Sequence, residues 1–295
     1  MSPSCRCCQG LAVATGSITD PLANFRETMN FRQLHQGPAL LKVANVWDAG
    51  SAVLVQALGV PALATTSAGL AWALGHADGN HLPIAEHAAA IRRIVRVARV
   101  PLSVDSEAGY SDDPATVADN VMRLAEAGAV GINLEDGAGA PALLCRKIEA
   151  IRAATARAGI DLFVNARCDV YLKNLAPGRS ADEVLRRARA YAAAGADGLF
   201  AAGATAVADI QALVAGQPLP LNLLARPALP GPDELQRLGV RRLSAGSAIA
   251  EAAWGRAQRA AAGFLAQGGG ADLYDDATPY PQVNGAFAAA NTAQG

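Results

Sequence analysis

The chain has 295 residues, of which 52% are hydrophobic and 17% charged, enough for one large α/β domain or two ordinary ones. A formal net charge of −1 gives no electrostatic basis for binding nucleic acid or an anionic membrane surface. No apolar run approaches the ~20 residues of a membrane-spanning helix, and the N-terminal segment lacks the long apolar stretch of a signal peptide, so we expect a cytoplasmic protein.

The first part of the chain, residues 1–20, is expected to be a disordered segment before the folded domain. Three of the five cysteines lie there, and an odd cysteine count in a chain of this size argues against a disulfide framework. These three, Cys5, Cys7 and Cys8, could bind a soft metal, but no His or further Cys lies nearby, which favours the disordered start. The following segment, Pro21–Gln36, predicts a helix that flanks the barrel described below.

A repeated unit then runs along the chain, in which an Ala-rich helical segment ends in Gly and a short apolar run follows. Glycine suits the left-handed position that closes a helix, so each Gly marks a joint between helix and strand. The apolar runs predict eight strands: Leu41–Val46, Val60–Thr66, Pro101–Asp105, Ala129–Glu135, Ile160–Arg167, Ala196–Ala201, Leu219–Leu224 and Val240–Ser244. The other segments predict helices: Ser51–Leu58, Ile84–Ala98, Pro114–Ala127, Ala140–Ala158, Ala181–Ala194, Val207–Ala215, Pro232–Leu238 and Ser247–Gln267.

These strands are apolar on both faces, as parallel strands covered by helices are. Eight strand–helix units predict a (β/α)8 TIM barrel over residues 21–268, with Asp113 and Ser180 as helix N-caps. A doubly wound open sheet is the alternative, but it needs fewer strands or a second domain, and no linker is visible. A glycine run at 268–270 predicts a hinge, so that residues 269–295 form a tail whose helix, Pro281–Ala290, packs on the barrel or on a neighbouring subunit.

Polar residues gather at the C-terminal ends of the predicted strands, the edge where parallel α/β proteins bind ligands. They are Trp47, Asp48, Thr65, Thr66, Ser67, Asp105, Glu107, Glu135, Asp136, Asn165, Arg167, Asn222, Ser244 and Ser247. So many polar residues at one end of an apolar barrel predict an enzyme site.

Asp105 and Glu107 are two residues apart, and Glu135 ends the next strand, so these carboxylates are expected to converge. Such a cluster repels itself unless a cation neutralises it, and oxygen ligands favour Mg²⁺ or Mn²⁺. The structural alternative is that Glu107 or Asp136 caps a helix, or that Arg167 pairs with one carboxylate.

Arg167 is the expected anion clamp, because a guanidinium matches a carboxylate or phosphate with two parallel hydrogen bonds; an inter-strand salt bridge is the alternative. Cys168 should point away from the site as a packed thiol. His76 and His81 fall in the long loop after the second strand, where each is either an acid/base or a solvated side chain.

Five segments form an ordered set along the chain: Asn45–Ala52, Thr65–Ser67, Val104–Tyr110, Asn133–Gly137 and Asn165–Arg167. Together they resemble the isocitrate lyase/phosphoenolpyruvate mutase superfamily, in the manner of a PEP phosphonomutase-like member, over about Phe25 to Ala290. The resemblance implies a barrel whose eighth helix is exchanged between the subunits of a homodimer or homotetramer.

The resemblance also implies the roles of individual residues. Mg²⁺ would be held by Asp105, with Glu107, Glu135 and Asp78 nearby or acting through water. The substrate, a small 2-oxo acid or dicarboxylate, would contact Arg167 and a set of residues on the other strand ends: Trp47, Asp48, Thr66, Ser67, Ala68 and Asn222.

Superfamily members break a bond next to a 2-oxo acid, and the loop after the fourth strand selects the reaction. Lyases carry a Cys in that loop and mutases a Lys, whereas residues 136–141 here have no Cys, His or Lys. This favours a reaction that needs little from the loop, the decarboxylation or retro-aldol cleavage of an oxaloacetate-like acid, with Tyr110, His76 or a metal-bound water as the replacement acid/base. The alternatives are phosphonopyruvate hydrolase or mutase chemistry, and a protein that binds a 2-oxo acid without turning it over.

Overall fold

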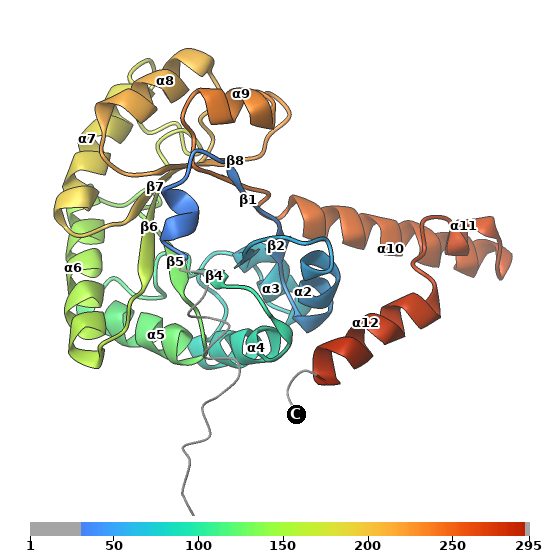
Figure 1. The fold of residues 1–295 in the computed structure, drawn as a ribbon. Coiled ribbons are helices and arrows are strands. Elements are labelled where there is room, and N and C mark those ends of the chain that lie inside the picture. The colour runs from blue at the N-terminus through green and yellow to red at the C-terminus, as the bar shows by residue number, and fades with distance from the viewer. Residues whose placement is uncertain (1–30, 293–295) are drawn as a thin grey trace, which may run out of the picture.

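The computed structural model describes residues 31–292 and contains one sheet of parallel strands, with β1 (Leu41–Val43) paired to β9 and β2 (Asn45–Val46) paired to β3. These two strands are the halves of the first predicted strand, which is interrupted at Ala44. Because β1 and β2 stand at the two ends of the strand order and are adjacent in the chain, the sheet forms a nearly closed barrel (Figure 1). The remaining strands are β3 (Leu63–Thr65), β4 (Leu102–Asp105), β5 (Gly131–Glu135), β6 (Phe163–Cys168), β7 (Gly198–Ala201), β8 (Leu221–Leu224) and β9 (Arg242–Ser244). The predicted (β/α)8 barrel is therefore confirmed.

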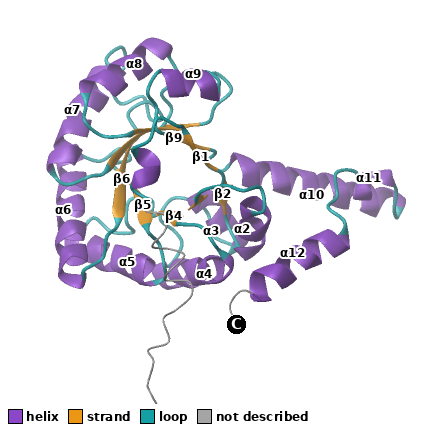
Figure 2. Cartoon of the chain, viewed as in Figure 1, coloured by secondary structure: helices purple, strands orange, loops and turns teal. Residues whose placement is uncertain are grey.

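Helices surround this barrel, as Figure 2 shows in purple around the orange strands. They are α2 (Ala49–Gln56), α3 (Ser67–Ala73), α4 (Ile84–Val97), α5 (Pro114–Glu126), α6 (Pro141–Ala158), α7 (Ser180–Ala193), α8 (Val207–Gly216), α9 (Pro232–Arg237), α10 (Ala248–Gln267), α11 (Ala271–Tyr274) and α12 (Tyr280–Thr292). All eight predicted barrel helices are present, and α3 is an addition that its small apolar sequence did not reveal. Across residues 31–292, no helix is both long and apolar enough to cross a membrane.

The two predicted N-caps have different outcomes. Asp113 caps α5, because its carboxylate accepts a hydrogen bond from the Thr116 N–H at 2.9 Å. Ser180 is wrong as an N-cap: it is the first helical residue of α7, and Arg179 takes the cap position without a side-chain bond. The reason is that the Ser180 hydroxyl donates instead to the Ala176 carbonyl of the preceding turn.

The C-terminal helices leave the barrel and then return to it. In Figure 1, α10 projects away from the barrel, and α12, which contains the predicted helix Pro281–Ala290, folds back beside α2. Ala286, Phe287 and Ala290 pack against the same apolar cluster as the buried residues of α2. The cysteines at positions 5–8 and most of the predicted helix Pro21–Gln36 lie outside the described residues; of that helix, the described part contains a short 3-10 turn, Gln33–His35.

Alternating side chains of each strand face the helices and the barrel interior. On β6, Val164, Ala166 and Cys168 are fully buried against the helices, which leaves Phe163, Asn165 and Arg167 facing the interior. The packed thiol predicted for Cys168 is thus confirmed.

The interior becomes more polar from the bottom of the barrel toward the site. At the bottom, Phe31 and Phe163 meet edge to face at 5.5 Å between ring centroids, and His35 stacks on Phe163 at 4.3 Å. Above this plug, the Asn165 side-chain amide donates to the side-chain carbonyls of Asn133 at 2.9 Å and Asn222 at 3.0 Å. We call these three hydrogen-bonded residues the asparagine ladder; they lie directly beneath the charged groups of the site.

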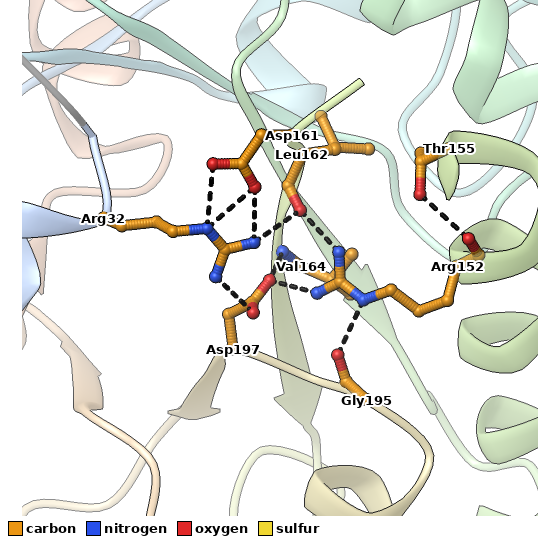
Figure 3. Close-up of polar contacts among 8 residues, drawn as sticks. All are labelled: Arg32, Arg152, Thr155, Asp161, Leu162, Val164, Gly195 and Asp197. Atoms are coloured by element: carbon orange, nitrogen blue, oxygen red, sulfur yellow. Dashed lines mark hydrogen bonds and ion pairs between the residues drawn. The ribbon is translucent and has the colours of Figure 1, made fainter. Parts of the chain in front are cut away.

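An ion-pair network fastens the plug to the bottom of the barrel (Figure 3). Arg32 pairs with Asp161 and Asp197, and Arg152 of α6 also pairs with Asp197. The Asp197 carboxylate further accepts a hydrogen bond from the Val164 N–H at 2.7 Å. Because it lies at the end of the barrel opposite the strand C-termini, we interpret the network as stabilising the fold.

We expect Asp197→Asn to lower the free energy of unfolding by about 2–4 kcal/mol, since it leaves two guanidinium groups without their shared carboxylate. Urea denaturation monitored by circular dichroism measures this. Asp161→Asn is the matched control: its side chain is 66% exposed, so its loss should cost less than about 1 kcal/mol. Equal effects of the two substitutions would contradict the role given to Asp197.

Candidate active site

A pocket of about 150 Å³ opens at the C-terminal ends of the strands. It is lined by Asn45, Thr66, Ser67, Ala68, Asp78, Asp105, Asn133, Arg167, Phe200, Ala202, Leu224, Ser244, Gly246 and Ser247. The predicted residues Thr66, Ser67, Ala68, Asp105 and Arg167 come together here, and so does Asp78.

Asp105 ends β4 on the wall of the pocket. Its backbone N–H donates to the Thr65 hydroxyl at 2.9 Å. Its Oδ1 atom is buried and has no hydrogen-bond partner within residues 31–292. Burial raises the pKa of Asp105, and the charge of Arg167 opposes that rise.

Arg167 of β6 is held in place by two carboxylates. Its Nε and Nη2 donate to the two oxygens of Asp169 at 2.7 and 3.2 Å, and its Nη1 lies 2.7 Å from Glu135 Oε2. Burial alone would lower the pKa of Arg167, but Glu135, Asp105 and Asp169 raise it, so the side chain stays charged. These contacts leave N–H donors on Nη1 and Nη2 for a ligand in the pocket that Arg167 lines. The salt bridge and the anion clamp, alternatives in the sequence, are therefore compatible.

Glu107 lies in a tight turn after β4 that is fastened to the loop before α4. Glu107 and Tyr110 have φ of +49° and +62°, and the Asn80 side-chain carbonyl accepts hydrogen bonds from the Ala108 and Tyr110 N–H groups. The Glu107 carboxylate in turn accepts from the Asn80 N–H. Lys147 of α6 donates to the Ala108 carbonyl at 2.9 Å, which supports the turn from below. Burial raises the pKa of Glu107.

The carboxylates are not arranged as a closed set of metal ligands. Within residues 31–292, no three His, Cys, Asp or Glu side chains group closely enough to hold one ion. The physical reason is that Glu135 is engaged by Arg167 and Glu107 by Asn80, which leaves Asp105 and Asp78 at the pocket. Mg²⁺ commonly takes one or two protein carboxylates and fills its other positions with water and substrate. The unpartnered Asp105 oxygen beside Asp78 fits that mode of binding.

Several predicted site residues do not line the pocket. Asp48 caps α2 in a capping box with Ser51, and the Trp47 N–H also donates to the Ser51 hydroxyl. Asn222 lies beneath the pocket in the asparagine ladder.

The two replacement acid/base candidates do not line the pocket. His76 lies 3.3 Å from Glu86, and the Tyr110 hydroxyl donates to Glu107 Oε1 at 3.3 Å and lies 2.9 Å from His87 Nδ1. Burial also raises the pKa of Tyr110, which makes it a poor acid where it stands.

The sequence analysis missed Asp169, and it named Asp136 without its role in orienting the site. Asp169 stands two residues after Arg167, a spacing that could have indicated it. Asp136 is buried, where it receives hydrogen bonds from Arg187 at 2.7 Å, Tyr191 at 2.6 Å and the Asp169 N–H at 2.9 Å. The loop after β5 therefore starts from a fixed point.

A parallel barrel with carboxylates and an arginine at the C-terminal ends of its strands is typical of a barrel enzyme. The sequence profile of the phosphoenolpyruvate phosphomutase family matches residues 31–265, and the chain belongs to that family, within the isocitrate lyase/PEP mutase superfamily of lyases and mutases.

Relatives in sequence include an uncharacterized protein and an oxaloacetate decarboxylase. The chain is 37% identical to an uncharacterized protein of Mycobacterium tuberculosis, over 74% of this chain and 82% of the relative. It is 31% identical to an oxaloacetate decarboxylase of Bradyrhizobium diazoefficiens, over 71% of this chain and 75% of the relative.

Solved structures similar to this chain also come from mutases and lyases. A candidate phosphonomutase from Burkholderia cenocepacia is 41% identical, with a TM-score of 0.74, over 81% of this chain and 97% of the other. A 2,3-dimethylmalate lyase is 26% identical, with a TM-score of 0.71, over 80% of this chain and 86% of the other.

We expect Arg167→Lys to weaken the binding of oxalate, a planar carboxylate probe, by about 1.5–3 kcal/mol, because an ammonium cannot reproduce the guanidinium fork. Isothermal titration calorimetry in the presence of Mg²⁺ measures the dissociation constant. Arg186→Lys on the exposed face of α7 is the control and should leave it unchanged. Unaltered oxalate binding in the Arg167 variant would rule out the clamp.

Proposed function

We propose that this protein is a Mg²⁺-dependent lyase that cleaves the C–C bond next to the keto or hydroxyl carbon of a small 2-oxo or 2-hydroxy dicarboxylate, an oxaloacetate-like acid first. The observation that carries this proposal is that Arg167 and Asp105 line the same pocket, and that Asp105 has a buried oxygen, Oδ1, without a hydrogen-bond partner within residues 31–292. Mn²⁺ has similar ligand preferences and is the alternative ion.

The pocket supports a small acid as the substrate. Its volume of about 150 Å³ is below the range of roughly 300–1,000 Å³ that is usual for larger ligands. Arg167 would bind a carboxylate, with the Thr66 and Ser67 hydroxyls beside it. The apolar wall of Phe200, Ala202 and Leu224 excludes water, which strengthens charge interactions inside.

Asp105, with Asp78 beside it, would hold the ion. When bound, Mg²⁺ polarises a keto oxygen and stabilises the negative charge that develops on it during cleavage. Residues Asp169 and Glu135 keep Arg167 oriented, so that the acid is positioned before reaction.

Decarboxylation is the reaction that needs least from a proton donor in the pocket. The C–C electron pair moves into an enolate, neutral CO₂ leaves, and a proton added afterwards gives the 2-oxo monoacid. No acid is needed before the bond breaks, which suits a pocket that neither Tyr110 nor His76 lines. The similarity to an oxaloacetate decarboxylase at 31% identity supports this reaction.

Cleavage of a P–C bond, as in phosphonopyruvate hydrolase or PEP phosphonomutase chemistry, is the second candidate. It is supported by the match to the phosphoenolpyruvate phosphomutase family and by the similarity to the Burkholderia protein. The loop after β5, with no Cys, His or Lys at 136–141, counts against it.

We expect the protein to convert oxaloacetate into pyruvate, to lose this activity with EDTA, and to regain it with Mg²⁺. A lactate dehydrogenase-coupled assay measures pyruvate, with enzyme-free Mg²⁺ as the blank. We expect Asp105→Asn to lower kcat/KM by about a hundredfold or more, since it removes the charged ligand. Asp112→Asn, whose side chain is 93% exposed, is the matched control.

The same experiment separates the alternatives. Phosphate released from phosphonopyruvate, with no pyruvate from carboxylate substrates, would support P–C chemistry. Oxalate binding without turnover of 2-oxo, 2-hydroxy or phosphono acids would support a protein that only binds the acid.

We also propose that the protein forms a homodimer or homotetramer through α10–α12. Within the described residues, Ala250 is the one buried residue of α10, while Phe264 and Leu265 are 50% and 82% exposed. These exposed apolar side chains would be buried if the helix packed against a second copy of the chain.

We expect multi-angle light scattering to give at least a dimer, and the double substitution Phe264→Glu and Leu265→Glu to shift it toward monomer by placing charges in the contact. Arg157→Glu, on the exposed side of α6, should not. A monomeric wild-type protein would refute the exchange.

A further inference from the structure

A buried arginine lies beneath the pocket and takes no part in the site described above. Arg242 of β9 is 1% exposed. It shares the inward face of β9 with Ser244, which lines the pocket, while Leu243 packs on the outer apolar cluster. Its Nη2 lies 3.4 Å from the Ser103 hydroxyl of β4, so the side chain crosses the barrel interior.

This position puts the guanidinium close below Asp105. Ser103 and Asp105 are two residues apart on β4 and face the same side. Two residues of strand correspond to a rise of about 7 Å. The Arg242 charge therefore lies roughly one such step below the carboxylate that would hold the ion.

The charge is poorly compensated by its surroundings. Within residues 31–292, Arg242 has no ion pair, its Nε and Nη1 are buried without a hydrogen-bond partner, and its nearest aromatic contact is the Phe31 ring at 5.9 Å. Burial lowers its pKa to about 10, so it remains charged at neutral pH. A buried unpaired charge is costly, and an apolar side chain of similar size would serve packing better.

We propose that Arg242 is a positioning residue whose buried charge makes the pocket bind an anionic acid more tightly and a free divalent ion more weakly. This inference rests on the proposed function, because it concerns the same ion and the same acid. A positive charge below Asp105 repels Mg²⁺ and attracts a dicarboxylate. The two effects nearly cancel when a dication and a dianion are bound together.

This electrostatic role has a signature that a packing role lacks. Removing the charge should tighten Mg²⁺ binding and weaken oxalate binding by similar factors, so that the product of the two dissociation constants changes little. The ion would lie beyond the Asp105 carboxylate, about 8–10 Å from the guanidinium, where each unit of ligand charge is worth about tenfold or more in affinity at an effective dielectric constant near 20. Tenfold is therefore the smallest change that we expect for a doubly charged ligand. Loosened packing would instead weaken both ligands.

The experiment titrates Mg²⁺ alone, and then oxalate into protein saturated with Mg²⁺, by calorimetry. It compares wild-type protein with Arg242→Met and Arg242→Lys. We expect Arg242→Met to bind Mg²⁺ about tenfold more tightly and oxalate about tenfold more weakly, with a Tm equal to or above that of the wild type. Arg242→Lys keeps the charge and should keep both constants within about threefold of the wild-type values.

The outcomes separate the two proposals. Wild-type protein that binds neither Mg²⁺ nor oxalate would overturn the proposed function. Wild-type binding of both, with constants that stay the same or weaken together in Arg242→Met, would overturn the role of Arg242 alone. If Arg242→Met does not fold, Arg242→Gln is measured in its place, and failure of both to fold would show that Arg242 is structural.

Discussion

Charge pairing in the barrel mouth is the constraint on which the rest of the site depends. The carboxylates at the ends of β4 and β5 are largely buried, and burying a charge without a partner costs free energy. Arg167 compensates Glu135 and is itself fixed by Asp169, whose own N–H is bound by Asp136. Asp136 is then held by Arg187 and Tyr191 of α7. Through these contacts α7 fixes the orientation of Arg167 in the pocket.

This pairing divides the acidic residues between two tasks. Carboxylates with a cation or a backbone donor stabilise the structure, and in the proposed function Asp105, whose buried Oδ1 has no hydrogen-bond partner within residues 31–292, holds the ion. Burial raises the pKa of Glu135 to about 7, and the charge of Arg167 opposes that rise.

Small residues in the barrel interior are as necessary as the charged ones. A Cβ on Gly198 would lie 2.6 Å from the Asn165 side-chain carbonyl, and one on Gly131 would lie 2.8 Å from the Phe31 ring. The first would disrupt the asparagine ladder and the second would displace the plug. Both glycines lie on the inward faces of their strands. Their lack of a side chain gives Asn165 and Phe31 the space that they occupy inside the barrel.

The sequence predicted the strands and helices well because apolar runs and glycine joints repeat with the fold, and it placed Asp105, Arg167 and the Thr66–Ala68 turn at one end of the barrel. It could not predict partners that depend on distant contacts. Asn80 and Glu107 meet only because two loops fold onto each other, and nothing near Arg242 in the sequence indicates that its side chain crosses to Ser103. Residue type and strand end fix which groups reach the mouth, whereas pairing across the barrel decides which of them remain free to bind a ligand. A pocket lined by Asp105, Asp78 and one oriented guanidinium therefore suits the proposed reaction, which needs charge stabilisation more than proton transfer.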